Sequence, residues 1–386
     1  MKLKRLALVT LVLSISVAAY SQRDPDYDKV VVPQTRIDAR DLGYAPVDVI
    51  PDGESGITSL TVAPNGYLYG ATSGSHAHLF VLIPLHGYVQ PLGVIPGATS
   101  IRHAVAVSAS GDVYIGTSPG GHLLKYTPHD EFDQSIQIGK PLPVMDLGQP
   151  VAGENIFALT IDRKANAIYG LTSPNAHFFE YSIASGKFTD FGVVAKNIPE
   201  GEKFEHDKIM SRTLIVDREG NVFSSGENGS FFRFDPKAQK LEKLSIQAPA
   251  VPGREPWTRV DAFLPDPSGA IYGGTSDGYL FRLDPENLTV TNLGKPLNQY
   301  RIDGLVRASD GKLYGVGGDK EEMARLFSYD PSTGAYHVMG FIDVDRRPYY
   351  VWQAYGVGAM AIGNRGTIYI GENERISKLY LFYPGQ

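Results

Sequence analysis

The sequence predicts an all-β fold, a seven-bladed β-propeller whose ring of four-stranded antiparallel blades is closed by an N-terminal strand. A unit of alternating apolar residues, a glycine-containing turn and an aromatic–glycine strand occurs seven times. Its key aromatic recurs at intervals of about 50 residues, a spacing typical of propeller blades. The seventh copy lacks a fourth strand, and a segment before the first copy resembles one. The key aromatics are Tyr69, Tyr114, Tyr169, Phe223, Tyr272, Tyr314 and Tyr369.

Each copy predicts four strands, here called a to d from the axis to the rim. Alternation of apolar and polar residues with a period of two favours strands over helices. The a–b turns carry Asn-Gly, Ser-Gly, Glu-Gly or Asp-Gly, because a tight hairpin needs the positive φ that glycine adopts freely. The c–d turns at 235–236, 284–285 and 330–331 are Asp-Pro, which suits the first two positions of a type I turn.

The closing strand is predicted at 44–51. Its sequence, YAPVDVIP, resembles VQPLGVIP at 89–96, the predicted strand d of the first copy. Paired beside the last copy, this segment would leave the ring without an open sheet edge. The copies fill nearly all of 22–386, so we expect a single propeller domain.

Residues 1–21 have the organisation of a secretory signal peptide. A basic stretch at 2–5 precedes an apolar run at 6–20, and Ala19 and Ser21 are small residues suited to a cleavage site. The run is too short for a stable membrane span. We therefore expect cleavage near Ser21 and a monomeric, secreted or periplasmic protein with no membrane span.

Composition limits the function classes. Lys and Arg total 36 against 42 Asp and Glu, a net charge of −6, which argues against a generic nucleic-acid binder. The chain has no cysteine, which excludes disulfides, thiolate nucleophiles and Cys-ligated zinc. It also contains no P-loop, nucleophile-elbow or His-Glu-x-x-His motif.

Polar residues gather where strands a and c begin. The d–a and b–c connections of a propeller lie on one face, so both sets should surround the same central funnel. Packing alone would favour small or apolar residues at this crowded axis, yet several positions carry charge. The heads of strand a hold Thr58, His103, Phe157, Arg212, Asp261, Asp303 and Gly358. The heads of strand c hold His78, His122, His177, Ser230, Tyr279, Arg325 and Lys378.

The long d–a connections add aromatic and basic side chains to this face. They contain the only two tryptophans, Trp257 and Trp352, with Tyr355 close by. Such aromatics either stack on sugar rings or cover the top of the propeller, and the sequence leaves both open. Arg259 and Arg301 bring positive charge to an otherwise acidic protein, which favours an anionic ligand.

The seven repeats, the signal peptide and the pair His103 and His122 resemble the β-propeller polysaccharide lyases, namely the ulvan lyases and the rhamnosyl-glucuronate lyases. The likeness covers most of the chain as architecture, and its motif-level match is confined to the two histidines. It implies β-elimination in uronate-containing glycans, with the histidines as base and acid. It also implies an arginine at the uronate carboxylate, for which Arg212 fits, and a tyrosine, for which Tyr279 is a candidate.

The resemblance makes an anionic, uronate-containing polysaccharide or oligosaccharide the expected partner. The remaining polar and aromatic residues of this face would then contact the glycan. They are His78, His177, Trp257, Arg259, Asp261, Arg301, Asp303, Arg325, Trp352 and Tyr355.

Two interpretations from other classes stay open. One is a non-catalytic propeller that binds a glycan or a protein on the same face. The other is a metal-dependent hydrolase or lactonase in which Asp261 and Asp303 hold a divalent cation. The pattern requires no cofactor, and a structural or catalytic divalent metal would need His and carboxylate ligands, for example at His76 and His78. A single histidine at a strand end is most often structural.

Overall fold

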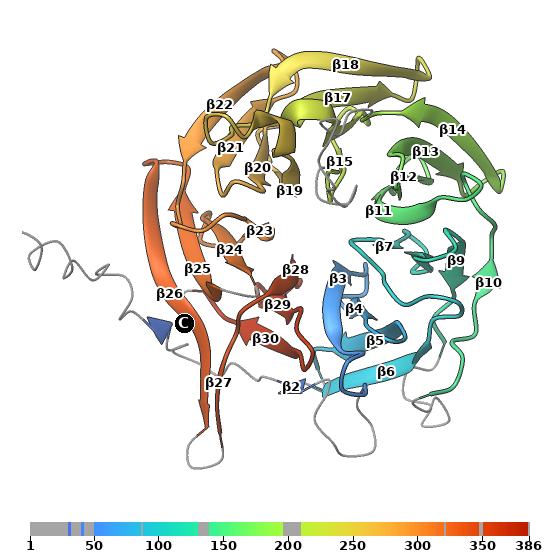
Figure 1. Cartoon of the computed structure of the whole chain (residues 1–386), viewed down its shortest axis with the longest axis horizontal. Helices are drawn as coiled ribbons and strands as arrows, with labels where there is room; N and C mark the ends of the chain where they lie inside the picture. Colours follow the sequence, from blue (N-terminus) through green and yellow to red (C-terminus); the bar gives the residue numbers. More distant parts are fainter. Residues whose placement is uncertain are drawn as a thin grey trace, which may run out of the picture.

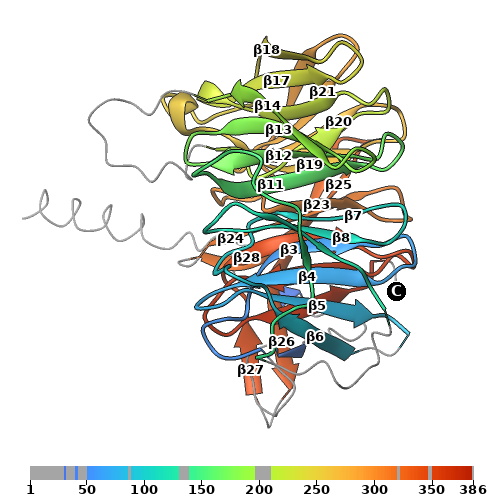
Figure 2. The same cartoon turned by 90° about the vertical axis from the view of Figure 1, so that its right-hand side faces the viewer.

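Seven sheets surround one central axis, as the sequence predicts (Figure 1). The computed structural model describes residues 30–31, 40–41, 50–85, 88–129, 139–195, 210–319, 322–346 and 350–384. Within these ranges the only helices are two 3-10 turns, η2 (Glu227–Gly229) and η3 (Glu255–Trp257). Viewed from the side, the ring is a disc whose strands run across its thickness (Figure 2). No helix in the described ranges has the length and apolarity needed to cross a membrane.

The first five blades follow one another along the chain, each with strand a nearest the axis (Figure 1). Blade 1 consists of β3 (Gly56–Val62), β4 (Leu68–Ser73), β5 (His78–Ile83) and β6 (Tyr88–Val94). Blade 2 consists of β7 (Val105–Val107), β8 (Val113–Gly116), β9 (Leu123–Tyr126) and β10 (Met145–Asp146). Blade 3 consists of β11 (Asn155–Asp162), β12 (Ala167–Ser173), β13 (His177–Ser182) and β14 (Lys187–Val193).

Blades 4 and 5 keep the same order. Blade 4 consists of β15 (Ile215–Val216), β16 (Val222–Ser225), β17 (Ser230–Asp235) and β18 (Lys240–Gln247). Blade 5 consists of β19 (Val260–Pro265), β20 (Ile271–Thr275), β21 (Leu280–Asp284) and β22 (Thr289–Gly294).

The last two blades incorporate the N-terminal segment. Blade 6 consists of β23 (Gly304–Arg307), β24 (Leu313–Asp319), β25 (Glu322–Asp330) and β26 (Ala335–Arg346). Here β1 (Val30–Val31) pairs in parallel with β26, and β27 (Tyr350–Gln353) pairs antiparallel with the end of β26. Blade 7 consists of β28 (Val357–Ile362), β29 (Ile368–Glu372), β30 (Lys378–Phe382) and β2 (Arg40–Asp41).

The ring is closed by the N-terminal segment, which confirms the predicted kind of closure. Strand β2 takes the fourth position of blade 7, with Arg40 opposite Leu379 on β30. The predicted closing strand, 44–51, begins later in the chain than β2. Residues 44–49 lie outside the described residues, and 50–51 are not in a strand. The match to another strand d therefore predicted the closure but placed the pairing strand too late in the chain, because rim strands face solvent and their side chains specify pairing weakly.

The aromatic–glycine signature is a packing device inside four of the blades. The key aromatics of all seven copies are buried. The glycine after the aromatic faces a phenylalanine of strand c, as where Gly70 pairs with Phe80. A Cβ at Gly70 would lie 2.1 Å from the Phe80 ring, so only glycine leaves room for it. The same pairing recurs at Gly170–Phe179, Gly273–Phe281 and Gly315–Phe327.

The predicted turns have the expected backbone. Gly66 in the a–b turn of blade 1 has φ +87°, and Asn166 takes the corresponding left-handed conformation, with φ +53°, in the longer turn of blade 3. In the Asp-Pro turns the aspartate side chain accepts hydrogen bonds from the backbone N–H groups of the residues that follow. The Asp284 carboxylate, for example, accepts hydrogen bonds from the backbone N–H groups of Glu286 and Asn287, both at 3.0 Å.

Candidate functional site

The heads of strands a and c lie on one face of the ring, because these two strands run in the same direction through each antiparallel blade. We call it the funnel face. His78, His177, Ser230 and Lys378 are each the first residue of their strand c, as the alignment of the copies predicts.

Asp261 forms the centre of a charged group at the axis. Its Oδ1 accepts a hydrogen bond from Arg259 Nε at 2.8 Å, and its Oδ2 accepts one from Arg301 Nε at 3.0 Å. Arg212 Nε lies 3.9 Å from Asp261 Oδ1, and Arg301 also pairs with Asp303 at 2.6 Å. Asp261 and Asp303 are buried, so these ion pairs are shielded from water. We call these five residues the axial cluster.

Positive charge exceeds negative charge in the axial cluster, which holds three guanidinium groups and two carboxylates. Burial alone would raise the pKa of Asp261, yet Arg259 and Arg301 hold it well below its usual range. Burial, together with the charges of Arg301 and Arg259, lowers the pKa of Arg212 to about 9. A site in which an arginine carries uncompensated charge favours an incoming anion.

His103 lies beside the axial cluster, on the chain that enters β7. Its backbone N–H donates to the Thr58 carbonyl at 3.1 Å, and its carbonyl accepts from the Leu159 N–H at 3.0 Å, so it ties blade 2 to both neighbours. Burial, followed by the charge of Arg212, lowers the pKa of His103 to about 3. The imidazole is therefore neutral near pH 7. Within the described part of the chain its ring nitrogens form no hydrogen bond.

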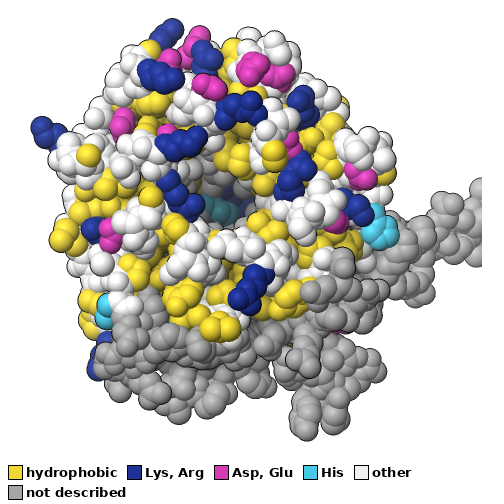
Figure 3. Space-filling model, turned by 180° about the vertical axis from the view of Figure 1, so that it is seen from behind, with side chains coloured by type: hydrophobic (Ala, Val, Ile, Leu, Met, Phe, Trp, Pro, Cys, Tyr) yellow, Lys and Arg dark blue, Asp and Glu magenta, His cyan; other side chains and the backbone are white. Residues whose placement is uncertain are grey.

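A central hollow is visible from the face opposite to that of Figure 1, with histidine and basic side chains inside it (Figure 3). His103 keeps partial exposure, which is consistent with a side chain that lines an axial channel.

The other members of the predicted inner ring are structural. Thr58 Oγ1 donates to the Ile101 carbonyl at 2.6 Å. Phe157 is buried, and the guanidinium carbon of Arg102 lies 5.6 Å from the centre of its ring. At Gly358 a Cβ would lie 2.1 Å from a backbone oxygen of blade 1, so this position admits only glycine.

His122 stands at the head of strand c in blade 2 and is partly exposed. Its Nδ1 lies 2.8 Å from Asp146 Oδ2, and the Gln149 amide nitrogen lies 3.2 Å from its Nε2. This geometry fits a neutral ring that donates from Nδ1 to the carboxylate and accepts at Nε2. Asp146 is itself held by the Gly148 N–H at 2.8 Å.

The same arrangement recurs one blade further on. His177 Nδ1 lies 2.9 Å from Asp190 Oδ2, and Asp190 accepts the Gly192 N–H at 2.8 Å. The His–Asp pair is thus a repeated feature of blades 2 and 3, which gives it an architectural role in both. A catalytic role for His122 must therefore come from its position and not from its aspartate.

His103 and His122 sit two strands apart in the same blade. The β7–β8 and β8–β9 ladders are in register at Val105–Ile115 and Ile115–Leu124. Neighbouring strands are about 4.8 Å apart, so the two backbones are roughly 10 Å apart. No interaction joins the two rings directly within the described residues.

His78 is buried in blade 1, away from the channel chemistry. Its Nε2 lies 2.7 Å from Glu54 Oε2, and the other oxygen of Glu54 lies 2.6 Å from His76 Nδ1. The predicted His76–His78 pair therefore shares one carboxylate. Among the described residues, no group of three or more His, Asp or Glu side chains is arranged to hold a metal ion.

Basic and aromatic side chains form a shelf beside the axial cluster. Lys295 Nζ lies 5.7 Å from the ring centre of Tyr279 and 5.6 Å from that of Tyr300. The Arg254 guanidinium lies 5.6 Å from the Tyr300 ring, which is 58% exposed. Tyr300 also precedes Arg301 of the axial cluster. We call Arg254, Tyr279, Lys295 and Tyr300 the aromatic shelf; the predicted catalytic tyrosine belongs to it.

Two other predicted contact residues lie in packed surroundings. Trp257 ends η3 and is half-buried. The loop around it is fixed by the buried Asp277, which accepts hydrogen bonds from Arg254 Nε at 3.2 Å and from Thr258 Oγ1 at 2.9 Å. Arg325 is buried, with its guanidinium carbon 4.7 Å from the centre of the Phe341 ring.

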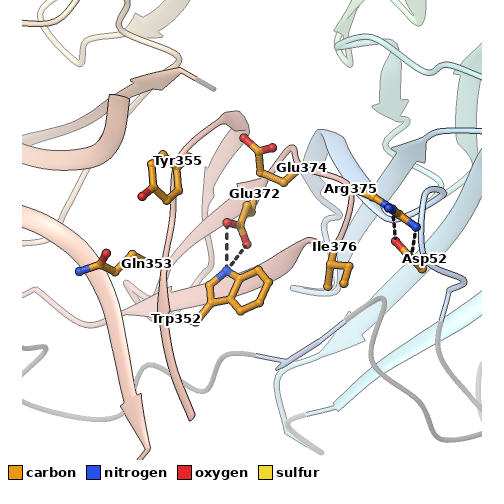
Figure 4. Close-up of a pocket in the computed structure, with 8 residues that line it drawn as sticks. All are labelled: Asp52, Trp352, Gln353, Tyr355, Glu372, Glu374, Arg375 and Ile376. Carbon is orange, nitrogen blue, oxygen red and sulfur yellow. Dashed lines mark hydrogen bonds and ion pairs between the residues drawn. The ribbon is translucent and has the colours of Figure 1, made fainter. Parts of the chain in front are cut away.

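Trp352 and Tyr355 lie in a pocket of about 760 Å³ on the funnel face (Figure 4). The pocket is formed by β27, the end of β29 with the loop that follows it, and the segment before β3. It shares no residue with the axial cluster or the aromatic shelf. Its lining residues are Asp52, Trp352, Gln353, Tyr355, Glu372, Glu374, Arg375 and Ile376.

Several residues of these sites were not singled out in the sequence. Asp146 could have been found, because both His–Asp pairs are marked by an Asp-x-Gly triplet in strand d. Lys295 and Glu372 carry no such signal. Lys295 is one of many lysines, and Glu372 ends a strand b where the other copies have Thr or Gly at the equivalent position.

No protein-family model and no curated protein sequence matches the chain. The fold is similar to that of a streptogramin B lyase, with a TM-score of 0.62 and 12% identity over 89% of this chain and 97% of that one. It is equally similar to a catalytically inactive histidine variant of virginiamycin B lyase from Staphylococcus aureus with quinupristin, at TM-score 0.62, 10% identity, and 90% and 100% coverage. The extracellular domain of a B. thetaiotaomicron one-component system matches at TM-score 0.58 and 16% identity, over 89% of this chain and 40% of that one. At these identities the likeness establishes the propeller fold alone.

Proposed function

We propose that this protein is an exported polysaccharide lyase that cleaves a uronate-containing glycan by β-elimination on the funnel face. One observation carries the proposal. The neutral imidazole of His103 has no hydrogen-bond partner among the described residues and lies beside Arg212, whose Nε is buried without one. A proton acceptor and an open carboxylate-binding group thus occupy the same basic channel.

The reaction needs these two groups together. The base takes the C5 proton of the uronate, and the electrons of that C–H bond form the C4=C5 double bond. The C4–O bond breaks, and the departing oxygen receives a proton. Negative charge develops on the carboxylate as C5 loses its proton, so a guanidinium at the carboxylate stabilises the transition state more than the ground state. Arg212 takes this role.

The charge of Arg212 explains how so weakly basic a histidine becomes an effective base. Repulsion from Arg212 contributes to the low pKa of His103. A uronate carboxylate bound to Arg212 compensates that charge and therefore raises the pKa of His103. His103 is therefore a stronger base when the substrate is bound. Without substrate the imidazole stays neutral, so it does not add a further positive charge beside the arginines.

His122 is proposed as the group that protonates the departing oxygen. Its backbone lies roughly 10 Å from that of His103, two strand spacings further out. The Asp146 carboxylate, 2.8 Å from Nδ1, fixes the orientation of the ring, and the position of His122 over blade 2 fits it for this role. The scissile linkage would then lie over blade 2, between the channel and His122.

The remainder of the glycan extends across the ring toward blades 5 and 6. The aromatic shelf continues directly from Arg301, and Lys295 and Arg254 supply positive charge between two tyrosine rings. Exposed tyrosine and basic side chains suit an anionic sugar chain, which offers both C–H faces and carboxylates. Tyr279 therefore contributes to substrate binding in this scheme.

Two fold neighbours are named as lyases, a streptogramin B lyase and a virginiamycin B lyase, and at 10–12% identity they show only that such a propeller can carry a lyase site. A virginiamycin B lyase with the same fold is catalytically inactive as a histidine variant. The metal-dependent hydrolase alternative has no comparable support, because Asp261 is already paired with two guanidinium groups and Asp303 with one.

A non-catalytic glycan-binding propeller is the second candidate. The observation in its favour is that the axial cluster is largely compensated internally, since Asp261 accepts hydrogen bonds from both Arg259 and Arg301. Such a cluster could bind an anion without catalysing any reaction of it. This candidate predicts binding of uronate glycans with no change in their covalent structure.

One assay separates the candidates. Purified protein is incubated with polygalacturonate, alginate, glucuronoxylan and rhamnosyl-glucuronate glycans, and the ultraviolet absorbance of the 4,5-unsaturated uronate is followed. The lyase proposal predicts that this absorbance increases with at least one glycan and that EDTA does not abolish the increase. Binding without absorbance change favours the non-catalytic candidate, and an increase that EDTA removes favours a metal-dependent enzyme.

A further inference from the structure

The pocket around Trp352 is a second site on the funnel face, chemically unlike the channel. The axial cluster holds an excess of arginines, whereas the pocket is lined by three carboxylates and one guanidinium. That guanidinium, on Arg375, is already committed to Asp52 through hydrogen bonds of 2.8 and 3.1 Å. Of the two remaining carboxyls, Glu372 is buried, and burial raises its pKa to about 7. The uncompensated carboxylate of the pocket is therefore that of Glu374.

Trp352 is held rigidly in this pocket. Its indole Nε1–H donates to the Glu372 carboxylate, with both oxygens at 3.1 Å (Figure 4). Glu372 is fixed in turn by the Lys378 N–H at 3.1 Å and the Tyr380 hydroxyl at 3.0 Å. Lys378 Nζ lies 4.4 Å from the centre of the Trp352 ring. An aromatic ring fixed in this way costs little entropy when a ligand stacks on it.

Acceptors for hydroxyl groups stand next to this ring. Glu374 Oε1 accepts the Gly356 N–H at 2.9 Å, which orients its carboxylate, while its second oxygen has no partner among the described residues. Gln353 and the exposed Tyr355 complete the same wall. In Figure 4, Trp352, Tyr355, Glu372 and Glu374 surround one space.

The combination selects against charged ligands. An acidic sugar would meet the carboxylate of Glu374 without a free guanidinium to pair with. A cationic ligand would compete with Lys378, whose ammonium already lies over the Trp352 ring. An uncharged sugar fits both features, because its C–H face stacks on the indole and its hydroxyls donate to carboxylates. The volume, about 760 Å³, accommodates more than one sugar ring.

We propose that this pocket binds the uncharged sugar residues of a glycan, with Trp352 as the stacking platform and Glu374 as the hydroxyl acceptor. The proposal does not depend on lyase activity, because it applies equally to a propeller that only binds glycans. If the channel binds an acidic sugar as proposed above, one molecule would carry separate sites for acidic and neutral sugars on the same face.

The two tryptophans of the chain make the test direct. In a Trp257→Phe variant, Trp352 is the only tryptophan left, so its fluorescence reports on the pocket alone. The variant is titrated with cellotetraose, xylotetraose and mannotetraose, and separately with a galacturonate tetramer and a glucosamine tetramer. We expect a saturable fluorescence change with at least one neutral tetramer and none with the charged tetramers at the same concentration.

Calorimetry with the neutral tetramer that binds gives the second measurement. Trp352→Ala should abolish detectable binding, and Glu374→Gln should weaken it about tenfold, the value of one charge-assisted hydrogen bond. Because Glu374→Gln keeps an acceptor for the Gly356 N–H, it tests the site even if the tryptophan variant folds poorly. The proposal would be overturned if only a charged tetramer bound, or if no tetramer bound. It would also be overturned if Trp352→Ala and Glu374→Gln bound the neutral tetramer as tightly as the unsubstituted pocket does.

Discussion

Replacing His103 with asparagine should lower the kcat of uronate-glycan cleavage by ~10²–10⁴-fold, the usual cost of losing a general base. Asparagine is the suitable substitute because His103 has φ +42°, a left-handed conformation that asparagine tolerates better than most residues. The backbone hydrogen bonds to Thr58 and Leu159 are then retained, so the unfolding temperature should change little. The measurement is a kcat from the unsaturated-uronate assay, with a thermal melt of the same sample.

Blades 2 and 3 provide a matched control for the acid. His122→Asn and His177→Asn remove the same kind of His–Asp pair from equivalent positions. If His122 protonates the leaving oxygen, its variant should lose ~10²-fold or more in kcat, while the His177 variant changes KM at most. Equal effects in the two variants would show that the pair is architectural and that the acid lies elsewhere.

Asp261→Asn should reduce the free energy of unfolding by about 3–5 kcal/mol, because it leaves buried guanidinium groups without their main counter-charge. Asp261 is 2% exposed and accepts hydrogen bonds from Arg259 and Arg301. Its folded pKa lies below its unfolded value, so its stabilising effect is complete at neutral pH and is lost only as the pH falls below about 4. Urea unfolding at pH 7 therefore measures the full effect.

Asp52→Asn is the control for this measurement. Asp52 forms a two-point ion pair with Arg375, but both side chains are exposed to water, at 41% and 81%. Exposed pairs contribute about 0–1 kcal/mol, so this variant should unfold at nearly the wild-type urea concentration. Similar losses at Asp52 and Asp261 would contradict the view that the axial cluster is a tightly coupled buried group.

The fold could be predicted because one signal repeats seven times. In four copies the key aromatic is followed by a glycine that leaves room for a phenylalanine of strand c, as Gly70 does for Phe80. Counting back from each aromatic also located the axis, which places Arg212 and Asp261 within 3.9 Å of each other and both beside His103. Positions that lie the same number of residues before the key aromatic of each copy therefore lie at a similar distance from the axis.

Contacts between loops could not be predicted in this way. Lys295 and Tyr279 come from different connections, and their proximity depends on loop paths that the repeat does not fix. The same is true of Trp352 and Glu372, which meet because β26 and β27 form a ribbon that the described parts of the other blades lack. The repeat places His103 and His122 on one face, at the heads of strands a and c, but it does not show that two strand spacings separate them, with His122 further from the axis.

The most direct test of the account is the protonation state of His103 with and without a bound uronate. Imidazole nitrogen shifts are recorded by NMR from pH 8 to pH 4.5 on ¹⁵N-histidine-labelled protein, with His103→Asn to assign the signal. We expect a ring that stays neutral throughout this range in the free protein, because burial and the charge of Arg212 lower its pKa to about 3. Once a uronate oligosaccharide neutralises Arg212, the ring should begin to protonate at a higher pH. A free-protein titration near the ordinary histidine pKa of 6.5, or no change on adding the uronate, would contradict it.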